Sequence, residues 1–400
     1  MPIPEDIGSD VLTETTHVGL GQKLVGSVVG ALFGVLLLAA SSIGLFWNEG
    51  RAVTTARSLS EGGPQVVSVA ADRVAPENEG RLVHVTGPLT TTALLADPEF
   101  GVTVQGAVLA RQVEMYQWKE EQRTETSKNF GGSEERTTTY TYVGTWSSHR
   151  IDSSHFKQNG KSNPQMRYQS VMIAAKDATL GAFRPSEGVL RRLAAKERLP
   201  VDTALESRFR ERGSKAQVVD GVIYLGTDPA KPAIGDLRIS YHVARPATAT
   251  IVGRQSGSDF ATFQTRAGDA LLFAKSGAVT ATDVFAQAQD ENRILTWCLR
   301  AVGVVVMLIG FALLCWPLVA LGDIIPIVGS ILGAGAVFVA IFLTALVAPL
   351  VIASAWLWYR PLIALGVMGV GVVIAILTRS LTGGRKLAGA LPQAASAVSR

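Results

Sequence analysis

One short stretch of the chain brings serine, histidine and aspartate close together. It runs from Ser147 to His155, with His149 and Asp152 between them. Two histidines six residues apart could begin a zinc site, and serine, histidine and aspartate together are the set that hydrolases use. Zinc needs a third ligand and groups that orient the ligands. The chain also has no G-x-S-x-G, no H-E-x-x-H and no phosphate-binding glycine loop.

The other residues that could do chemistry are few. His84 and His242 lie in apolar, strand-like runs and are interpreted as packed polar residues. Cys298 and Cys315 are the only cysteines, and both lie in or beside an apolar segment, so we expect no disulfide framework and no thiolate metal site. We therefore predict no catalytic residue, no metal and no cofactor, and keep a hydrolase built on residues 147–155 as the weakest alternative.

Charged residues are unevenly distributed along the chain, and this distribution predicts which segments contain the residues above. Apolar residues make up 48% of the chain and charged residues 18%, against roughly 25% charged in soluble proteins. Four stretches, 24–47, 301–321, 324–359 and 361–378, contain no charged residue. A bilayer core needs about 20 helical residues. This pattern excludes a soluble, fibrous or disordered protein and predicts a membrane protein with one large polar insert.

The sequence predicts an α+β membrane protein with four transmembrane helices, one N-terminal and three C-terminal. They surround a large, mostly antiparallel β-rich domain. Because 324–359 is too long for one perpendicular crossing, residues 323–330 are assigned to a turn. The predicted segments are an N-terminal segment 1–23, helix 24–47, a translocated domain 48–293, helices 294–321, 331–357 and 362–378, and a tail 379–400.

The basic tail orients this arrangement. Residues 379–400 carry Arg379, Arg385, Lys386 and Arg400 and no acid, so the tail is expected in the cytoplasm. Four crossings then place residues 1–23 in the cytoplasm as well, with 48–293 translocated. A cleaved signal peptide at 24–47 is the alternative, but the segment is longer than a typical apolar signal core and only Lys23 precedes it.

The predicted membrane helices have features of anchors and packing surfaces. Gly26, Gly30 and Gly34 share one stripe of the first helix, where another helix could approach closely. The crossing cores contain no charge and no histidine, which argues against an ion or proton relay. We expect three residues to lie as anchors at the membrane interface: Trp47, Trp358 and Arg360.

The insert has the patterns of a mixed domain without regular βαβ alternation. Residues 111–122 and 136–146 predict a long hairpin turned at Gly131-Gly132. Residues 186–213 have helical spacing and many basic side chains, which indicates a solvated helix or a contact with anionic lipid or an acidic partner. Asp283 is predicted to cap a helix that continues into the second crossing.

Several runs resemble the transmembrane protein 43 (LUMA) family over essentially the whole chain. They are Asn48-Glu-Gly-Arg-Ala52, Ala75-Pro-Glu-Asn-Glu-Gly-Arg-Leu-Val-His84, Val113-Glu-Met-Tyr-Gln-Trp118, Gly235-Asp-Leu-Arg238 and Trp358-Tyr-Arg-Pro-Leu362. The resemblance implies a multi-spanning protein of the endoplasmic reticulum and inner nuclear membrane in animals, with its large domain in the lumen. It also implies self-association, scaffold roles and contact with the nuclear lamina network, and it supplies no catalytic residue.

The sequence favours a bacterial member of such a family, because arginine outnumbers lysine and alanine and glycine are abundant, as in GC-rich genomes. We then expect an inner-membrane protein with residues 48–293 in the periplasm. Its predicted function is that of a non-enzymatic scaffold that forms a homo-oligomer, contacts the lipid bilayer and possible other membrane proteins, and binds no nucleic acid. The alternative is a receptor or sensor whose insert binds lipid headgroups or envelope components.

Overall fold

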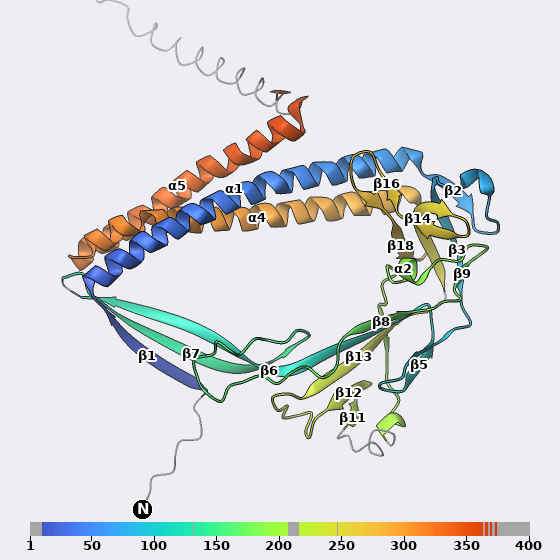
Figure 1. Cartoon of the computed structure of the whole chain (residues 1–400), viewed down its shortest axis with the longest axis horizontal. Coiled ribbons are helices and arrows are strands. Elements are labelled where there is room, and N and C mark those ends of the chain that lie inside the picture. The colour runs from blue at the N-terminus through green and yellow to red at the C-terminus, as the bar shows by residue number, and fades with distance from the viewer. Residues whose placement is uncertain are drawn as a thin grey trace, which may run out of the picture. The chain divides into compact units, whose positions relative to one another are not determined.

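A computed structural model of the chain describes residues 10–129, 131–206, 216–245 and 247–362, and single residues 365, 366, 369 and 373. Three long helices and many strands make up this part (Figure 1). The helices are α1 (Leu20–Gln65), α2 (Glu187–Leu190), α4 (Ala281–Gly322), α5 (Pro326–Tyr359) and a 3-10 helix, η1 (Pro76–Asn78). The strands are β1 (Val11–Val18), β2 (Val67–Ala70), β3 (Leu82–Thr90), β4 (Leu94–Asp97), β5 (Val102–Gln105), β6 (Val108–Lys128), β7 (Glu134–Ser147), β8 (Val171–Ala174), β9 (Thr179–Leu180), β10 (Glu197–Leu199), β11 (Ala216–Val219), β12 (Val222–Leu225), β13 (Leu237–Ala244), β14 (Thr248–Ser256), β15 (Asp259–Ala261), β16 (Phe263–Gln264), β17 (Ala270–Leu271) and β18 (Phe273–Ser276).

The chain divides into two compact units. The first is Met1–Gly26, Thr54–Asn292 and Ala320–Ser330, and it holds every strand that the structure describes. The second comprises residues 27–53, 293–319 and 331–400, and its described residues are almost entirely helical. Long apolar helices together with large antiparallel sheets confirm the α+β class expected from the sequence.

An eight-stranded antiparallel sheet forms the larger part of the first unit. Its main path is β1-β7-β6-β13-β12-β11, with β8 paired to β6 and β10 paired to β13. In β13, Leu237, Ile239, Tyr241 and Val243 are buried, and the residues between them are half-buried. This alternation is typical of a strand with one face on a core.

A second, six-stranded sheet completes the body of the first unit. Its main path is β15-β14-β3-β2, with β18 paired to β14 and β9 to β3, and only β2 and β3 run parallel. Val83 and Val85 of β3 belong to the same hydrophobic cluster as Val113 of β6 and Ile239 of β13. The two sheets therefore share one core.

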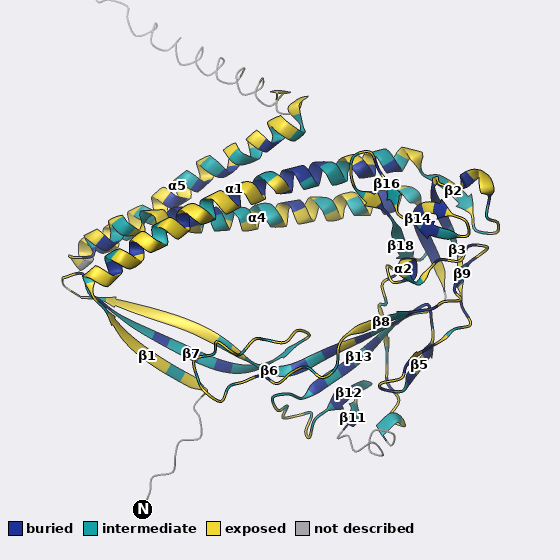
Figure 2. Ribbon diagram, in the orientation of Figure 1, coloured by how far each residue is buried: buried dark blue, intermediate teal, exposed yellow. Residues whose placement is uncertain are grey.

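Beyond the body, β6 and β7 continue as a long hairpin, and β1 adds a third strand beside β7. We call β1, β7 and residues 119–128 of β6 the arm. Residues 121–127 are exposed on both faces of the sheet (Figure 2). Gly131 and Gly132 form the turn with φ angles of 88° and 80°, a region that glycine enters without steric cost. The predicted hairpin is confirmed and is longer at both ends than expected.

The position of β1 differs from the topology expected from the sequence. β1 pairs antiparallel with β7 along its whole length, from Val11 opposite Thr141 to Val18 opposite Glu134. Neighbouring strands lie about 4.8 Å apart, so a bilayer cannot separate them. Residues 11–18 and 134–141 therefore belong to one sheet. The expectation that residues 1–23 and 48–293 lie on opposite sides of a membrane stays a prediction.

α1 continues well past the predicted end of the first crossing. It does not stop at Trp47 but runs to Gln65, through two glycines and a proline near its end. Its last turns pack against the second sheet, where Leu59 lies in a cluster with Leu82 and Phe285. This apolar contact outweighs the local tendency of glycine and proline to end a helix.

α4 begins at a side-chain cap and then runs unbroken. The hydroxyl of Thr280 accepts a hydrogen bond from the backbone N–H of Asp283 at 3.1 Å and donates one to its carboxylate at 2.7 Å. Thr280 is therefore the capping residue, and Asp283 is the third residue of the helix rather than its cap. The helix passes through Asn292 to Gly322, which confirms the predicted continuity with the second apolar segment.

The helical spacing predicted over residues 186–213 corresponds to helix in only part of the described residues. Glu187–Leu190 and residues 205–206 are helical, whereas Glu197–Leu199 forms β10, which pairs with β13. Residues 207–213 lie outside the described part of the chain. The helical spacing of the charges gives residues 197–199 only a weak local preference for helix. Pairing with β13 overrides this preference.

In the part of the chain that the structure describes, three helices are long and apolar enough to cross a membrane: α1, α4 and α5. The predicted crossing 331–357 lies within α5, which starts earlier because Pro326 suits the first position of a helix. The turn before it is therefore shorter than predicted, at residues 323–325. Most of the predicted fourth helix, 362–378, lies outside the described residues.

Candidate functional site

The histidine-containing stretch 147–155 lies on the surface of the first unit, at the end of β7 and in the segment that follows it. His149 and His155 are both exposed. The carboxylate of Asp152 accepts a hydrogen bond from the backbone N–H of Ser154 at 2.9 Å, and this bond holds the pKa of Asp152 below its usual value. Among the described residues, no group of three or more His, Cys, Asp or Glu could hold a metal ion. The carboxylate of the candidate triad therefore stabilises a turn.

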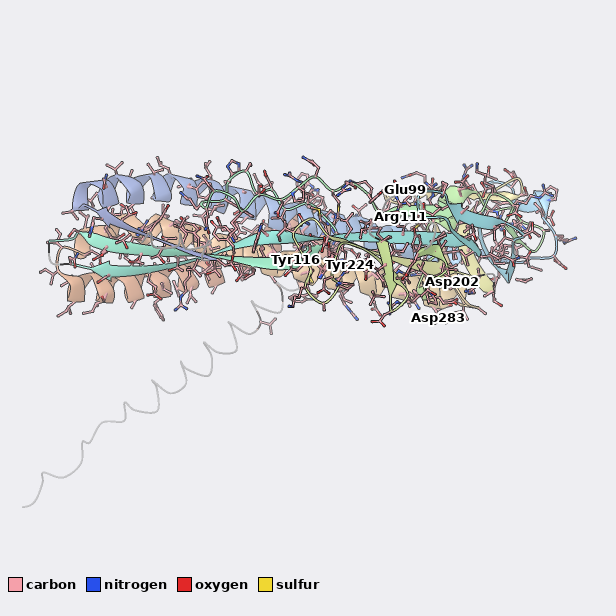
Figure 3. The ribbon with its side chains drawn as sticks, turned by 90° about the horizontal axis from the view of Figure 1, so that it is seen from below. Glu99, Arg111, Tyr116, Asp202, Tyr224 and Asp283 are labelled. Carbon is pink, nitrogen blue, oxygen red and sulfur yellow. The ribbon has the colours of Figure 1, made fainter. Side chains whose placement is uncertain are left out.

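A buried charge cluster that the sequence did not indicate lies in the core of the first unit. Arg111 of β6 is 2.8 Å from Asp97 of β4 and 2.6 Å from Glu99, as Figure 3 illustrates for Arg111 and Glu99. Tyr241 of β13 donates a hydrogen bond to Asp97 at 2.7 Å. Burial and the hydrogen bond to Asp97 raise the pKa of Tyr241, so the phenol stays protonated as a donor. The cluster joins three strands.

A second cluster closes the tip of the arm, entirely within the first unit. Lys23, in the first turns of α1, is 2.9 Å from Glu134 and also pairs with Asp323, between α4 and α5. Lys128 pairs with Asp323 at 2.5 Å, and Arg136 pairs with Glu134 at 2.6 Å. The side chains of Lys23, Glu134 and Asp323 are 6%, 5% and 2% exposed. Charges so removed from water depend on one another.

The acids of this cluster are held in their charged form. Burial alone would raise the pKa values of Glu134 and Asp323. Hydrogen bonds and positive charge from Lys23, Lys128 and Arg136 outweigh burial and hold both pKa values below their usual range. The cluster therefore ties the arm tip electrostatically to the start of α1 and to the turn before α5.

Within the second unit, another charged cluster joins the three long helices. Glu49 of α1 accepts two hydrogen bonds from Arg300 of α4, at 2.6 and 2.8 Å. The indole N–H of Trp356 of α5 donates to the same carboxylate at 2.8 Å. Beside it, the Asn48 amide donates to the carbonyl of Thr296 at 3.2 Å. A two-pronged arginine contact sets orientation as well as distance, so Glu49 locks three helices together.

The predicted interface anchors differ in their exposure. Trp47 and Trp358 are 62% and 76% exposed, and Arg360 is half-buried. Trp356 was not among the predicted anchors, and it donates a hydrogen bond to the buried carboxylate of Glu49. Two tryptophans two positions apart in a helix have the same local pattern, and only the position of Glu49 distinguishes them.

Two of the runs that resembled a known family meet in the second unit. A Cβ atom at Gly50 would lie 2.6 Å from the ring of Tyr359, so the ring packs directly on the backbone of α1. The rings of Phe46 and Tyr359 lie 5.4 Å apart at their centroids. Residues 48–52 and 358–362 therefore form one contact region.

The glycine stripe of α1 divides into two parts. A Cβ atom at Gly34 would lie 2.7 Å from the carbonyl oxygen of Gly310 and 3.0 Å from Leu313 Cβ, and one at Gly30 would lie 3.0 Å from the ring of Trp316. These two glycines therefore pack on α4 of the same chain. Nothing lies within 4 Å of such an atom at Gly26.

Together, the apolar helices and the two-sheet body define an integral membrane protein of the α+β class. The chain belongs to the transmembrane protein 43 family, whose model matches residues 115–361. It is 34% identical to human transmembrane protein 43 over 390 residues, which cover 93% of this chain and 95% of that protein. It is also 30% identical to the Drosophila melanogaster homolog over 290 residues, or 70% and 75% of the two chains. No solved structure matches it.

Proposed function

We propose that the protein is a non-enzymatic membrane scaffold, which self-associates and organises a membrane region or neighbouring membrane proteins. The arm carries this proposal. It is a narrow sheet that is exposed on both faces over residues 121–127 of β6, and β1 lies at its edge. A projecting sheet with an open edge suits association with another chain, because its backbone groups can extend the ladder.

The buried charge clusters support a structural role. Glu49 pairs with Arg300, Glu134 with Lys23, and Asp97 with Arg111. Each pair joins two different elements of the fold, and each charge is neutralised by its neighbours. Such groups hold helices and strands in place and are not poised to transfer a proton to a substrate.

The location follows from the composition and the tail. We propose the inner membrane of a bacterium, a fourth helix over 362–378, and the basic tail 379–400 in the cytoplasm. The body of the first unit then faces the periplasm.

The test is the mass of the full chain in its membrane environment. Protein extracted in mild detergent and protein transferred to lipid nanodiscs should both give complexes of more than one chain by native mass spectrometry. A monomer in both would overturn the scaffold proposal. His149→Ala and His155→Ala should leave the mass of the complex and the cellular phenotype unchanged, whereas a hydrolase built on 147–155 requires loss of function.

A further inference from the structure

The arm has two lateral edges, and the chain protects only one of them. At the β6 edge, the side-chain amide of Asn163 accepts a hydrogen bond from the N–H of Trp118 at 2.7 Å and donates one to its carbonyl at 2.9 Å. Farther out, this edge strand carries a series of exposed charged side chains: Lys119, Glu121, Arg123 and Glu125. Capped backbone and exposed charge are ways in which natural edge strands avoid further pairing.

Over residues 13–17, the β1 edge has no such protection from described residues. The carbonyl of Asp10 accepts a hydrogen bond from Tyr142 N–H at 2.8 Å, so even-numbered residues of β1 direct their backbone groups toward β7. The odd-numbered residues Thr13, Thr15 and His17 therefore direct theirs away, and all three are exposed. Glu14 is the only carboxylate of the strand, which contains no lysine, arginine or proline. No described strand pairs with this side of β1.

We propose that β1 pairs antiparallel with β1 of a second copy, so that one sheet continues across two arms. This inference rests on the proposed self-association and identifies its surface. The odd-numbered residues of β1, whose backbone groups point away from β7, must lie opposite odd-numbered residues of the second copy. The midpoint between two odd-numbered positions is itself a residue, so the two-fold axis must pass through a residue and not between two residues. An axis at Glu14 would set two carboxylates opposite each other, which is unfavourable.

An axis at Thr15 avoids this repulsion and uses seven residues of each strand. It also brings the half-buried Leu12 of one copy against the half-buried Val18 of the other. An axis at Thr16 would pair fewer residues. The resulting pairs are Thr15–Thr15, Thr13–His17, Glu14–Thr16 and Leu12–Val18.

The link between β1 and α1 favours a second copy over a soluble partner. β1 ends at Val18 and α1 begins at Leu20, just before its uncharged segment. Two copies in one bilayer therefore hold their β1 strands at the same level. Such confinement raises the effective concentration of one strand for the other without any new contact.

Single cysteines measure this pairing in the full chain in membranes, with Cys298→Ala and Cys315→Ala in the background. Residues paired across the axis lie about 5.5 Å apart at Cα, within the range of a disulfide. Thr15→Cys should form a cross-linked dimer in most chains under mild oxidation, and Glu14→Cys or Thr16→Cys several-fold less. Co-expressed Thr13→Cys and His17→Cys chains should cross-link to each other, whereas neither should cross-link alone.

A proline pair provides the second measurement. Thr15→Pro removes an N–H that faces away from β7, so it should leave the β1–β7 ladder in place and lower the mass of the complex at a given concentration. Thr126→Pro is the matched control, because Thr126 has the same parity as Trp118 and its N–H faces the protected β6 edge. It should leave the mass unchanged.

Each contrary result has a distinct meaning. If the wild-type chain is monomeric, both the scaffold and the edge pairing fail. If it is oligomeric but Thr15→Cys does not cross-link and Thr15→Pro has no effect, the edge pairing fails and the scaffold remains. Dominant cross-linking at Glu14→Cys overturns the register. Cross-linking that appears only after deletion of residues 1–9 shows that this segment covers the edge, and overturns pairing in the native chain.

Discussion

Lys23 Nζ lies 2.9 Å from Glu134 Oε2, and both side chains are buried although the two residues are far apart in the chain. The contact connects the first turns of α1 to the tip of the arm. Asp323 extends it to the turn between α4 and α5. The arm therefore has a fixed point at each end, the core of the body at one and this cluster at the other.

Lys23→Met should release the arm tip. Without the ammonium group, Glu134 and Asp323 remain buried without their shared partner, a change that typically costs about 3–5 kcal/mol. Hydrogen exchange of the full chain should show faster exchange at residues 128–135, including the Gly131 N–H that donates to the carbonyl of Ile324. Lys119→Met is the control, because Lys119 pairs with Glu121 at an exposed site where less than about 1 kcal/mol is at stake. Equal exchange in both variants would contradict the prediction.

The arm tip should also open in acid. Carboxylates with lowered pKa values stabilise the folded state above their unfolded pKa values, near 4.5 for Glu134 and 3.8 for Asp323. That stabilisation is lost as the pH falls through the lower folded values. Spin labels at Ser127→Cys and Ile325→Cys, in the cysteine-free background, should give a narrow distance distribution at pH 7 that broadens below about pH 4.

A double variant separates this titration from general acid unfolding. Glu134→Gln combined with Asp323→Asn should give the broad distribution already at pH 7, with no further change on acidification. A distribution that stays narrow in the double variant at pH 7 would show that these two carboxylates do not hold the tip.

Gly34→Leu should separate α1 from α4 within one chain. The new side chain would meet the carbonyl of Gly310 and the side chain of Leu313, and overpacking of this kind costs about 1–3 kcal/mol or more. We expect a lower melting temperature at unchanged mass of the complex. Gly26→Leu makes the same change where nothing lies within 4 Å, and should leave the melting temperature unchanged. A fall in mass with Gly26→Leu would instead reveal a contact between copies.

Glu49 and Arg300 should show strong coupling. Glu49→Gln leaves the half-buried guanidinium of Arg300 without its carboxylate and should destabilise the helices of the second unit by about 1–3 kcal/mol. The double variant Glu49→Gln/Arg300→Met should be less destabilised than the sum of the two single changes, as measured by melting temperature in one detergent. Strictly additive effects would mean that the pair does not act as a unit.

Thr13→Cys and Ser127→Cys should react with an impermeant thiol reagent from the same side of the membrane. They lie in strands of one sheet, whereas the sequence alone places them on opposite sides. Reaction from opposite sides would refute the β1–β7 pairing.

Local patterns in the sequence were sufficient for the features that depend on neighbouring residues. Uncharged stretches identified the three apolar helices that the structure describes, because a bilayer core requires a continuous apolar length. The strand-like run around His242 and the glycine pair at 131–132 identified a strand and a turn, because strand preference and positive φ are local properties. Family membership also followed from short runs such as 75–84.

Tertiary structure decided the features that depend on distant partners. Gly62, Gly63 and Pro64 are residue types that disfavour a helix, yet α1 continues through them. A Cβ atom at Gly62 would lie only 2.4 Å from Leu271, so glycine there permits close packing. The pairing of β1 with β7 and of Lys23 with Glu134 left no local signal. Hydropathy measures how a segment partitions into lipid, but it does not specify the distant strand with which a polar segment pairs.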